Sequence, residues 1–241
     1  MLDVAKMRQI HVIFAPMLTI IIPTLNAQAT LPKTLAAVFA HDLPVLEVVV
    51  VDGGSNDQTK LVATDGGAKV LDCEPGRGRQ LAFGAAETSG DWLMFLHADT
   101  VLPAGWEVDV SRFMTDPINS QRAAYFKLRF DDSSTGARRV AKLANWRAKA
   151  FGLPYGDQGL LIHRSLYDEV GGFKADLKIM EDVDLVQRLG PMRLKALRIF
   201  VTTSADKYRA GGWWARPLRN LLCLGLHLAG MPRRWIESLY T

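Results

Sequence analysis

The chain has 241 residues, of which 49% are hydrophobic, so it can bury a full core as one large α/β domain or two small ones. This composition excludes the disordered and fibrous classes of protein. The formal net charge is +4, yet residues 187–241 contain ten Lys or Arg against Asp206 and Glu237, which makes this region +8 and residues 1–186 about −4. This asymmetry suggests an anionic partner, either a membrane surface or a phosphorylated substrate, with nucleic acid least favoured because no aromatic-glycine signature accompanies the basic residues.

A basic start and an apolar run that continues to Ile22 resemble a secretory signal peptide. However, Pro16 and Pro23 interrupt that run, and cleavage after it would remove the first predicted strand. We therefore expect a cytoplasmic protein in which residues 1–16 are an N-terminal extension. No apolar stretch reaches the roughly 18 to 20 residues of a membrane-spanning helix.

Short apolar runs alternate with helical stretches in the first hundred residues. The pattern predicts strands at 18–22, 45–51, 69–73 and 92–96, and helices at 31–41, 57–63 and 79–88. Runs of Val, Ile and Leu with helices between them are typical of a parallel sheet covered on both faces. The fold class is therefore predicted as α/β, with a Rossmann-like, mostly parallel central sheet.

The alternation is less regular after residue 100. Helices are expected at 103–113, 137–151, 164–170, 181–189 and 216–230, and strands at 123–130, 160–163 and 195–202. No repeat or low-complexity linker divides the chain, so one domain is predicted over residues 17–241. We expect it to consist of a nucleotide-binding half at about 17–100, an acceptor half at about 101–205 and a C-terminal amphipathic helix at about 213–241.

The two cysteines, Cys73 and Cys223, form no C-x-x-C pair and lie in apolar surroundings. This usage favours buried free thiols in a reducing compartment. It provides no thiolate metal site.

Polar clusters follow three of the predicted strands, at 23–26, 52–57 and 97–99. Each cluster alone is compatible with a turn or a helix cap. Ligands of open parallel sheets bind beyond the carboxyl ends of the strands, so three such clusters together predict one shared site. The stretch 157–159 can line the same crevice or form a turn.

Two further clusters lie at predicted helix starts. Arg77 and Arg79 fall in the first turn of a predicted helix. The helix dipole disfavours each cation there by roughly 0.3 to 1 kcal/mol. Either both side chains are simply exposed to solvent, or a bound anion such as a diphosphate offsets their charge. Glu181, Asp182 and Asp184 either complement the dipole of their helix or include a general base.

In this order, the segments resemble the family 2 glycosyltransferases, which have the A-type glycosyltransferase fold. The resemblance covers about residues 17–190. It is carried by IIPTLN (21–26), VVVDGGSNDQT (49–59), GRGRQLAFGAA (76–86), GDWLMFLHADT (90–100) and EDVDLVQRL (181–189). Within the family, the chain is most similar to small bacterial transferases associated with radical-SAM and selenodomain proteins.

The resemblance implies a nucleotide-diphosphate-sugar donor, with a UDP-sugar expected, and a divalent metal, Mg or Mn, on its diphosphate. It assigns the nucleoside to Pro23, Asn26 and Asp52, with Asp52 at the base. It further assigns donor contacts to Arg77, Arg79 and Ala98.

The resemblance also implies that Asp99 is a metal ligand and that Asp182, beside Glu181, is the catalytic base. The family's usual acidic pair is here His97-Ala98-Asp99. Mg²⁺ needs only one or two carboxylates when substrate phosphates supply oxygens, so Asp99 is expected to be the sole direct protein carboxylate. His97 either ligates Mn²⁺, which accepts imidazole, or hydrogen-bonds the donor.

The expected reaction is an inverting single displacement onto an acceptor hydroxyl, since no nucleophile is placed to form a covalent sugar intermediate and the family it resembles is inverting. One alternative is a non-catalytic nucleotide-sugar-binding or scaffold protein with a degenerate metal site, against which the intact Glu181-Asp182 pair argues. Another is a nucleotidyltransferase, which would carry a Gly-rich basic loop where this chain has PTLNAQATLPK.

The C-terminal tail combines arginines and tryptophans around an apolar helix. This mixture predicts either a peripheral membrane contact or a helix packed on the domain with a basic outer face. The residues concerned are Arg209, Trp213, Trp214, Arg216 and Arg219 before the helix, and Arg233, Arg234 and Trp235 after it.

Overall fold

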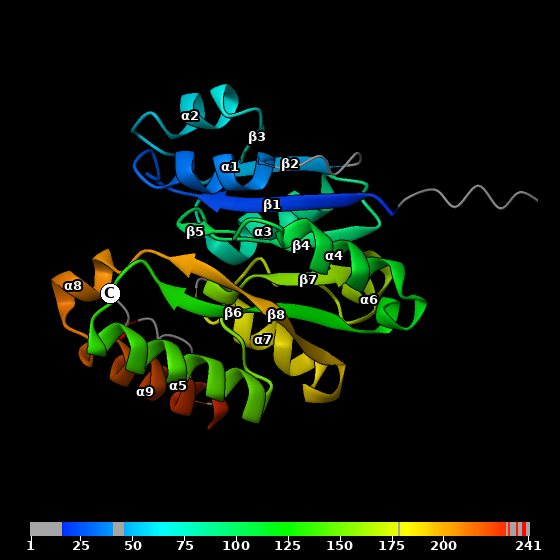
Figure 1. Ribbon diagram of the computed structural model, residues 1–241. Helices are drawn as coiled ribbons and strands as arrows, with labels where there is room; N and C mark the ends of the chain where they lie inside the picture. The colour runs from blue at the N-terminus through cyan, green and yellow to red at the C-terminus, as the bar shows by residue number, and fades with distance from the viewer. Residues whose placement is uncertain are drawn as a thin grey trace, which may run out of the picture.

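The computed structural model describes residues 16–40, 46–177, 179–229, 231, 235 and 238–239. Strands and helices alternate strictly up to residue 95 and less regularly after it (Figure 1). The strands are β1 Leu18–Thr24, β2 Leu46–Asp52, β3 Lys69–Asp72, β4 Trp92–Phe95, β5 Thr100–Val101, β6 Ala123–Phe130, β7 Leu160–His163 and β8 Leu194–Thr203. The helices are α1 Leu31–Phe39, α2 Thr59–Asp65, α3 Arg77–Ala86, α4 Trp106–Thr115, α5 Thr135–Phe151, α6 Arg164–Glu169, α7 Glu181–Leu189, α8 Asp206–Gly211 and α9 Ala215–Leu228.

The strands form one eight-stranded sheet in the order β3-β2-β1-β4-β7-β6-β8-β5. β1 pairs in parallel with β2 and β4, β2 with β3, and β6 with β8. β7 runs antiparallel to both of its neighbours, and the short β5 runs antiparallel to β8. The predicted mostly parallel α/β sheet is confirmed, with two reversed strands that the sequence pattern did not predict.

Both faces of the sheet are covered, as the continuous apolar runs predicted. In β1, Ile20 and Ile22 belong to a core cluster that includes residues of α1, α4 and α5, whereas Ile21 belongs to a second cluster with residues of α3, α6 and α7. Successive side chains of a strand point to opposite faces, so one run of isoleucines contributes to both cores. Figure 1 shows α1 and α3 on opposite faces of the sheet.

A helix of six residues, α8, was not predicted, and it joins the tail to the sheet. Tyr208 of α8 stacks on Trp213 with 5.4 Å between ring centroids, and both rings meet Phe130 of β6 edge-on. Arg209 forms ion pairs with three acids: Asp131, Asp132 and Asp206. Trp213 and Arg209, two residues of the proposed membrane contact, are therefore engaged in tertiary contacts.

Several predictions made from composition have different outcomes. Cys73 and Cys223 are free thiols, and Cys223 is buried, but Cys73 is only half-buried. Among the described residues, no helix combines the length and apolarity that crossing a membrane requires. The predicted N-terminal extension falls, apart from Pro16, outside the described residues.

Candidate active site

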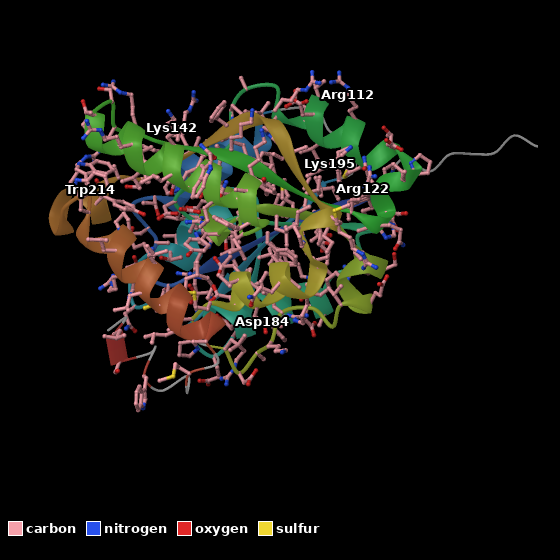
Figure 2. The ribbon with its side chains drawn as sticks, turned by 90° about the horizontal axis from the view of Figure 1, so that it is seen from below. Arg112, Arg122, Lys142, Asp184, Lys195 and Trp214 are labelled. Atoms are coloured by element: carbon pink, nitrogen blue, oxygen red, sulfur yellow. The ribbon has the colours of Figure 1, made fainter. Side chains whose placement is uncertain are left out.

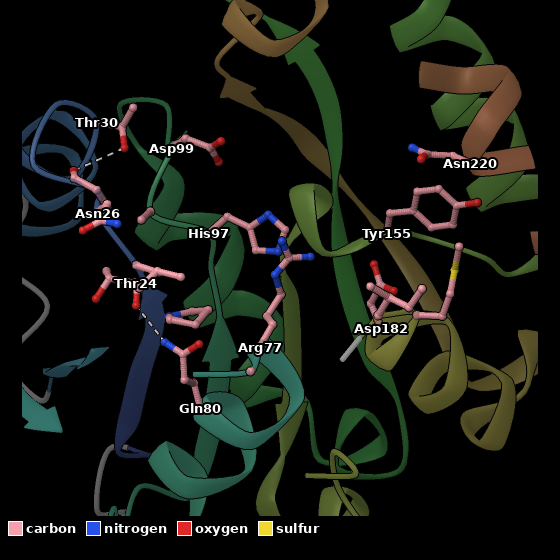
Figure 3. A pocket seen from close by; sticks show the side chains of 17 residues that line it. Thr24, Asn26, Thr30, Arg77, Gln80, His97, Asp99, Tyr155, Asp182 and Asn220 are labelled. Carbon is pink, nitrogen blue, oxygen red and sulfur yellow. Dashed lines mark hydrogen bonds between the residues drawn. The ribbon is translucent and has the colours of Figure 1, made fainter. Parts of the chain in front are cut away.

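A cavity of about 590 Å³ opens at the carboxyl ends of β1 and β4, between the first turns of α3 and α7. Figure 3 shows Thr24, Asn26 and Thr30 on one side of it, Tyr155, Asp182 and Asn220 on the other, and Arg77 and His97 between them. Most of the site residues predicted from the sequence line this cavity: Pro23, Asn26, Arg77, His97, Ala98, Asp99 and Asp182. Asp52, Arg79 and Glu181 do not line it.

Asp52 lies behind the cavity wall and is fully buried. Its Oδ1 accepts hydrogen bonds from the backbone N–H groups of Gly54 (3.0 Å) and Ser55 (2.8 Å), and its Oδ2 accepts from the hydroxyls of Thr24 (3.1 Å) and Ser55 (2.5 Å). Burial acts to raise the pKa of Asp52, but these hydrogen bonds outweigh it and hold the pKa below its ordinary value. The carboxylate thus fixes the loop after β2 and is not exposed to a ligand.

Asn26 connects that loop to the cavity. Its backbone lies in the left-handed region with φ 51°, its Oδ1 accepts a hydrogen bond from Asn56 N–H (2.9 Å), and its own N–H donates to Ser55 Oγ (2.8 Å). Asn tolerates this conformation better than most residues, and left-handed non-glycine residues concentrate at functional sites. The loops after β1 and β2 therefore form one cross-linked wall.

Gln80 of α3 completes this wall and was missed as a site residue. Its buried amide Nε2 donates to the carbonyls of Thr24 (2.8 Å) and Val51 (2.8 Å), so it joins the ends of β1 and β2 (Figure 3). The only signal in the sequence was its position in the first turn after Gly76-Arg77-Gly78-Arg79, which the helix pattern alone does not distinguish from a surface position.

The segment 97–99 leaves β4 across the centre of the cavity. Thr34 Oγ1 donates to the carbonyl of Ala98 (3.0 Å), and Ser204 N–H donates to the carbonyl of Asp99 (3.3 Å). The backbone is thus held from both sides, by α1 and by the end of β8. The side chains of His97 and Asp99 are left at the cavity surface, where Figure 3 shows them directed to different parts of it.

Asp182, the predicted base, lies in the first turn of α7. Its Oδ2 accepts a hydrogen bond from Gly156 N–H (2.7 Å), and its Oδ1 accepts from Val183 N–H (2.8 Å). Met180, which precedes α7, has φ 60°. In the described part of the chain, Met180 and Asn26 are the two non-glycine residues with left-handed backbone conformation. This strained turn directs Asp182 into the cavity.

Gly156 brings His97 and Asp182 together. A β-carbon on Gly156 would lie 2.4 Å from His97 Nε2 and 3.5 Å from Asp182 Oδ2, so any larger residue would displace the imidazole. The imidazole and the carboxylate therefore lie against the same point of the backbone, although they come from strands and helices far apart in the sequence.

Glu181, unlike Asp182, does not line the cavity and is 1% exposed. Its Oε1 lies 3.3 Å from a guanidinium nitrogen of Arg77, whose side chain reaches the cavity. Burial and the neighbouring Asp182 carboxylate raise the pKa of Glu181 to about 7, although Arg77 acts in the opposite direction. Both arginines are exposed, but Arg79, unlike Arg77, lies off the cavity wall.

Gly78 allows α3 to pack closely against the loop that precedes α7 and against Glu181, the first residue of α7. A β-carbon at this position would lie 2.6 Å from the carbonyl oxygen of Lys174 and 2.7 Å from that of Leu177. Adjacent residues of one motif therefore have two roles: Arg77 reaches the cavity, and Gly78 lets α3 pack closely against its neighbours.

The stretch 156–158 forms a 3-10 turn, so the turn is the alternative observed for residues 157–159, and none of these three residues lines the cavity. Gln158 is fully buried and donates to the carbonyl of Phe126 (3.1 Å). Burial raises the pKa of Asp157 to about 6; Arg147 opposes this shift, whereas Asp182 and Asp99 add to it. Asp157 therefore lies close enough to Asp182 and Asp99 for their charges to act on it.

Tyr155 and Asn220 also line the cavity and were not predicted. Tyr155 follows the helix end at Gly152, and Asn220 belongs to α9. Neither lies at a strand end, so the rule that identified the other residues could not find them.

Comparison with known proteins agrees with this geometry. Residues 19–165, more than half of the chain, match the profile described as glycosyl transferase family 2. A mycobacterial relative, the PGL/p-HBAD biosynthesis glycosyltransferase of Mycobacterium bovis, is 38% identical over 95 residues, which is 36% of this chain and 37% of that protein. Glucosyl-3-phosphoglycerate synthase of Mycobacterium tuberculosis is 32% identical over 96 residues, which is 36% of this chain and 30% of the synthase.

Solved structures share the fold over most of the chain. The mannosyltransferase PcManGT from Pyrobaculum calidifontis, in complex with GDP-Man and Mn²⁺, has a TM-score of 0.66 at 21% identity and covers 95% of this chain and 69% of that one. Glucosyl-3-phosphoglycerate synthase with Mn²⁺ and UDP has a TM-score of 0.59 at 21% identity and covers 90% and 81%. S. aureus TarS has a TM-score of 0.62 at 19% identity and covers 92% and 69%.

Proposed function

The chain belongs to glycosyl transferase family 2 and has the A-type glycosyltransferase fold, and from this premise we propose that it is an inverting glycosyltransferase. It moves a sugar from a nucleotide-diphosphate donor to an acceptor hydroxyl. One observation carries the proposal: Asp182 faces Arg77, His97 and Asp99 across one cavity at the carboxyl ends of parallel strands. A carboxylate opposite a cation and a polar loop suits base catalysis with an anionic leaving group.

The donor occupies the side of the cavity formed by Pro23, Asn26 and the 97–99 loop, with a UDP-sugar as the expected donor. Support comes from the related structures, which contain UDP, UDP-Glc or GDP-Man. Because both oxygens of Asp52 are engaged by Thr24, Gly54 and Ser55, we assign Asp52 to holding the donor-binding wall in place, rather than to a direct contact with the base.

A divalent cation, Mg²⁺ or Mn²⁺, fits this site only in part. The described residues contain no group of three or more His, Cys, Asp or Glu side chains that could hold a metal by themselves. Asp99, with His97 as the second candidate, would therefore hold the ion together with donor phosphate oxygens, as Mg²⁺ sites often do. When bound, such an ion offsets the negative charge that develops on the leaving diphosphate.

The chain's own residues perform the proton transfer and the charge stabilisation. The acceptor hydroxyl donates to Asp182, and as the proton moves to the carboxylate the acceptor oxygen attacks the anomeric carbon from the face opposite the diphosphate. The bond between that carbon and the diphosphate oxygen breaks, and its electron pair stays on the diphosphate, which the Arg77 guanidinium stabilises. The anomeric configuration inverts because a single displacement occurs.

The hydrogen bonds from Gly156 and Val183 orient the Asp182 carboxylate for this transfer. Glu181 is buried against Arg77, so we assign it the role of positioning the cation rather than that of a base. Arg79, which is exposed and off the cavity wall, is assigned no direct donor contact.

The test uses Asp182→Asn, with Asp168→Asn on the exposed face of α6 as the matched control. A panel of nucleotide sugars is first screened by thermal shift with Mn²⁺, and release of free sugar from the donor that binds is then measured with and without Mn²⁺. We expect Asp182→Asn to bind the donor like the wild type but to lose most of its turnover, by about 100-fold or more. Full turnover in Asp182→Asn would show that another group is the base.

His97, in place of an acidic partner for Asp99, supports one alternative, a non-catalytic nucleotide-sugar-binding or scaffold protein with a degenerate metal site. The same assay separates the two functions. Donor binding by the wild type without any metal-dependent release of sugar would support the alternative, whereas release requires catalytic competence.

Several finer predictions accompany this function. We propose a donor half at residues 17–100 and an acceptor half at 101–205, a cytoplasmic location and a place among the small bacterial transferases associated with radical-SAM and selenodomain proteins.

We also propose a peripheral membrane contact through the C-terminal tail, with Trp214 (49% exposed) and Trp235 (51% exposed) as its contact residues. Co-sedimentation with anionic liposomes, with and without residues 213–241, tests that contact.

A further inference from the structure

A second cavity, of about 380 Å³, lies between α5 and α9, directly beside the donor cavity. Its walls are mainly apolar and include Val140, Leu143 and Trp146 of α5 and Leu221 and Leu224 of α9. Tyr155 and Asn220 line both cavities, and Figure 3 shows them on the same side of the donor cavity as Asp182. The two cavities therefore meet next to the residue that we assign as the base.

Tyr155 is held firmly at this junction. The guanidinium carbon of Arg147 lies 3.3 Å from the centroid of the Tyr155 ring, and Arg147 Nε donates a hydrogen bond to the carbonyl of Leu153 (2.9 Å). A cation stacked on an aromatic ring at this distance interacts with its face. These two contacts of Arg147 fix the ring of Tyr155 where the two cavities meet.

Two residues of this cavity wall, Asp157 and Asn220, each have a buried oxygen without a hydrogen-bond donor in the described part of the chain. Oδ1 of Asp157 and Oδ1 of Asn220 are both sheltered from solvent and have no hydrogen-bond partner among the described residues. The Asp157 carboxylate in the cavity wall would repel a phosphate or a carboxylate, so an uncharged ligand fits this cavity better.

Apolar side chains continue outward from the cavity. Leu143 is 49% exposed, Trp146 58% and Leu221 62%, although all three are large and apolar. Figure 2 shows α5, near Lys142, and α9, which begins after Trp214, on the same side of the molecule. Contiguous exposed apolar surface of this kind marks a binding site more often than a solvated face.

Resting on the proposed function, we propose that this second cavity binds the acceptor and that the acceptor is an amphiphilic alcohol. Its apolar body, an aliphatic chain or an aromatic ring, packs between α5 and α9. Its hydroxyl end passes Tyr155 and Asn220 and reaches Asp182. The volume lies within the range of about 300 to 1,000 Å³ that is usual for small-molecule pockets, which are likewise mostly apolar with few polar groups.

The first test measures binding by calorimetry, with octan-1-ol and 4-butylphenol as amphiphilic probes and ethanol and phenol as their truncated counterparts. We expect each longer probe to bind the wild-type chain about tenfold or more tightly than its counterpart, because it buries additional methylene groups. Comparison of the aliphatic and aromatic probes identifies which kind of body fits better. Equal affinity of long and short probes would overturn the proposal.

The second test uses Leu221→Asp and Trp146→Asp, which place a charge in the cavity wall at exposed positions. The matched control is Leu61→Asp on α2, since Leu61 is 57% exposed and lies far from the cavity in the sequence and the fold. Both wall variants should bind the amphiphilic probes about tenfold more weakly than the wild type, and Leu61→Asp should bind them normally. Equal losses in all three variants would mean that the probes bind non-specifically.

Sugar transfer to the amphiphilic alcohols distinguishes failure of this inference from failure of the proposed function. If the wild type releases sugar from the donor but neither binds the probes nor glycosylates them, the acceptor inference is wrong and the transferase function stands. If it binds the probes but never releases or transfers sugar, the transferase function is wrong, and the cavity remains a site for amphiphilic alcohols.

Discussion

The backbone N–H of Gly156 donates a 2.7 Å hydrogen bond to Oδ2 of Asp182, so the 3-10 turn before β7 holds the proposed base in place. Gly156 also leaves the space that the His97 imidazole occupies. One small residue thereby sets the positions of two side chains that face the cavity. The following predictions examine this arrangement and the buried carboxylates around it.

Gly156→Ala should disrupt the active site without unfolding the protein. The new β-carbon would lie 2.4 Å from His97 Nε2, and its clash would displace the imidazole and shift Asp182. We expect sugar release to fall by about tenfold or more, since small misplacements of catalytic groups have effects of this size. Gly225→Ala is the control because no atom lies within 4 Å of its β-carbon position. Unchanged turnover in Gly156→Ala would contradict the proposed role of this turn.

Asp99→Ala should weaken metal-dependent donor binding, measured as the Mn²⁺ concentration that gives half-maximal donor affinity. We expect that concentration to rise about tenfold or more, because few other carboxylates are available to the ion. His97→Gln should leave it nearly unchanged, since His97 Nε2 lies against Gly156 and Figure 3 shows its ring and the Asp99 carboxylate directed to different parts of the cavity. A comparable rise in His97→Gln would identify His97 as a ligand.

Glu181→Gln should alter the pH dependence of stability. The folded pKa of Glu181 is raised to about 7 from an ordinary value of 4.5, so the folded state retains a proton that the unfolded state releases. Stability from this group is therefore fully present below about pH 4.5 and is lost as the pH rises towards about 7. Urea unfolding of the variant across this range should show a smaller loss than the wild type. Identical pH profiles would mean that Glu181 is not protonated in the folded state.

Asp157 titrates in an overlapping range, with a folded pKa of about 6, and contributes in the same direction. Asp157→Asn is therefore measured in parallel, and the double variant should have the flattest profile. This control separates the two groups, because only Glu181→Gln should also change the contribution of Arg77 to donor binding.

Asp52→Asn should destabilise the loop after β2. The carboxylate accepts four hydrogen bonds, and its pKa is held below 3.8, so its contribution is present above about pH 4 and is lost as the pH falls through the folded pKa. We expect the free energy of unfolding at pH 7 to fall by about 1 to 3 kcal/mol. Asp65→Asn, at an exposed position of α2, is the control and should have little effect. A stability equal to the wild type would refute the role of Asp52 in holding the loop.

Much of the fold could be predicted from the sequence because the strands are continuous apolar runs and the helices between them have regular spacing. β1, β2, β4 and β6 were predicted to within about two residues, and helix α7 was predicted at its observed bounds. The reversal of β7 could not be predicted, since a run such as Leu160–His163 has the same pattern in either direction. The two-residue β5 is too short to have a pattern at all.

The strand-end clusters at 23–26, 52–57 and 97–99 were enough to predict one shared site, because the carboxyl ends of parallel strands lie at one edge of a sheet. Glu181 and Asp182, at a helix start, were assigned to that site only by the family resemblance. Only the tertiary structure decided which side chains face that site. Four hydrogen bonds keep the Asp52 carboxylate buried behind the cavity wall. Glu181 and Asp182 are adjacent in the chain, but only Asp182 lines the cavity, because neighbouring residues on a helix do not share a face. Tyr155, Gly156 and Asn220 join the site only through long-range packing of α5, α7 and α9, which no local pattern in the sequence encodes.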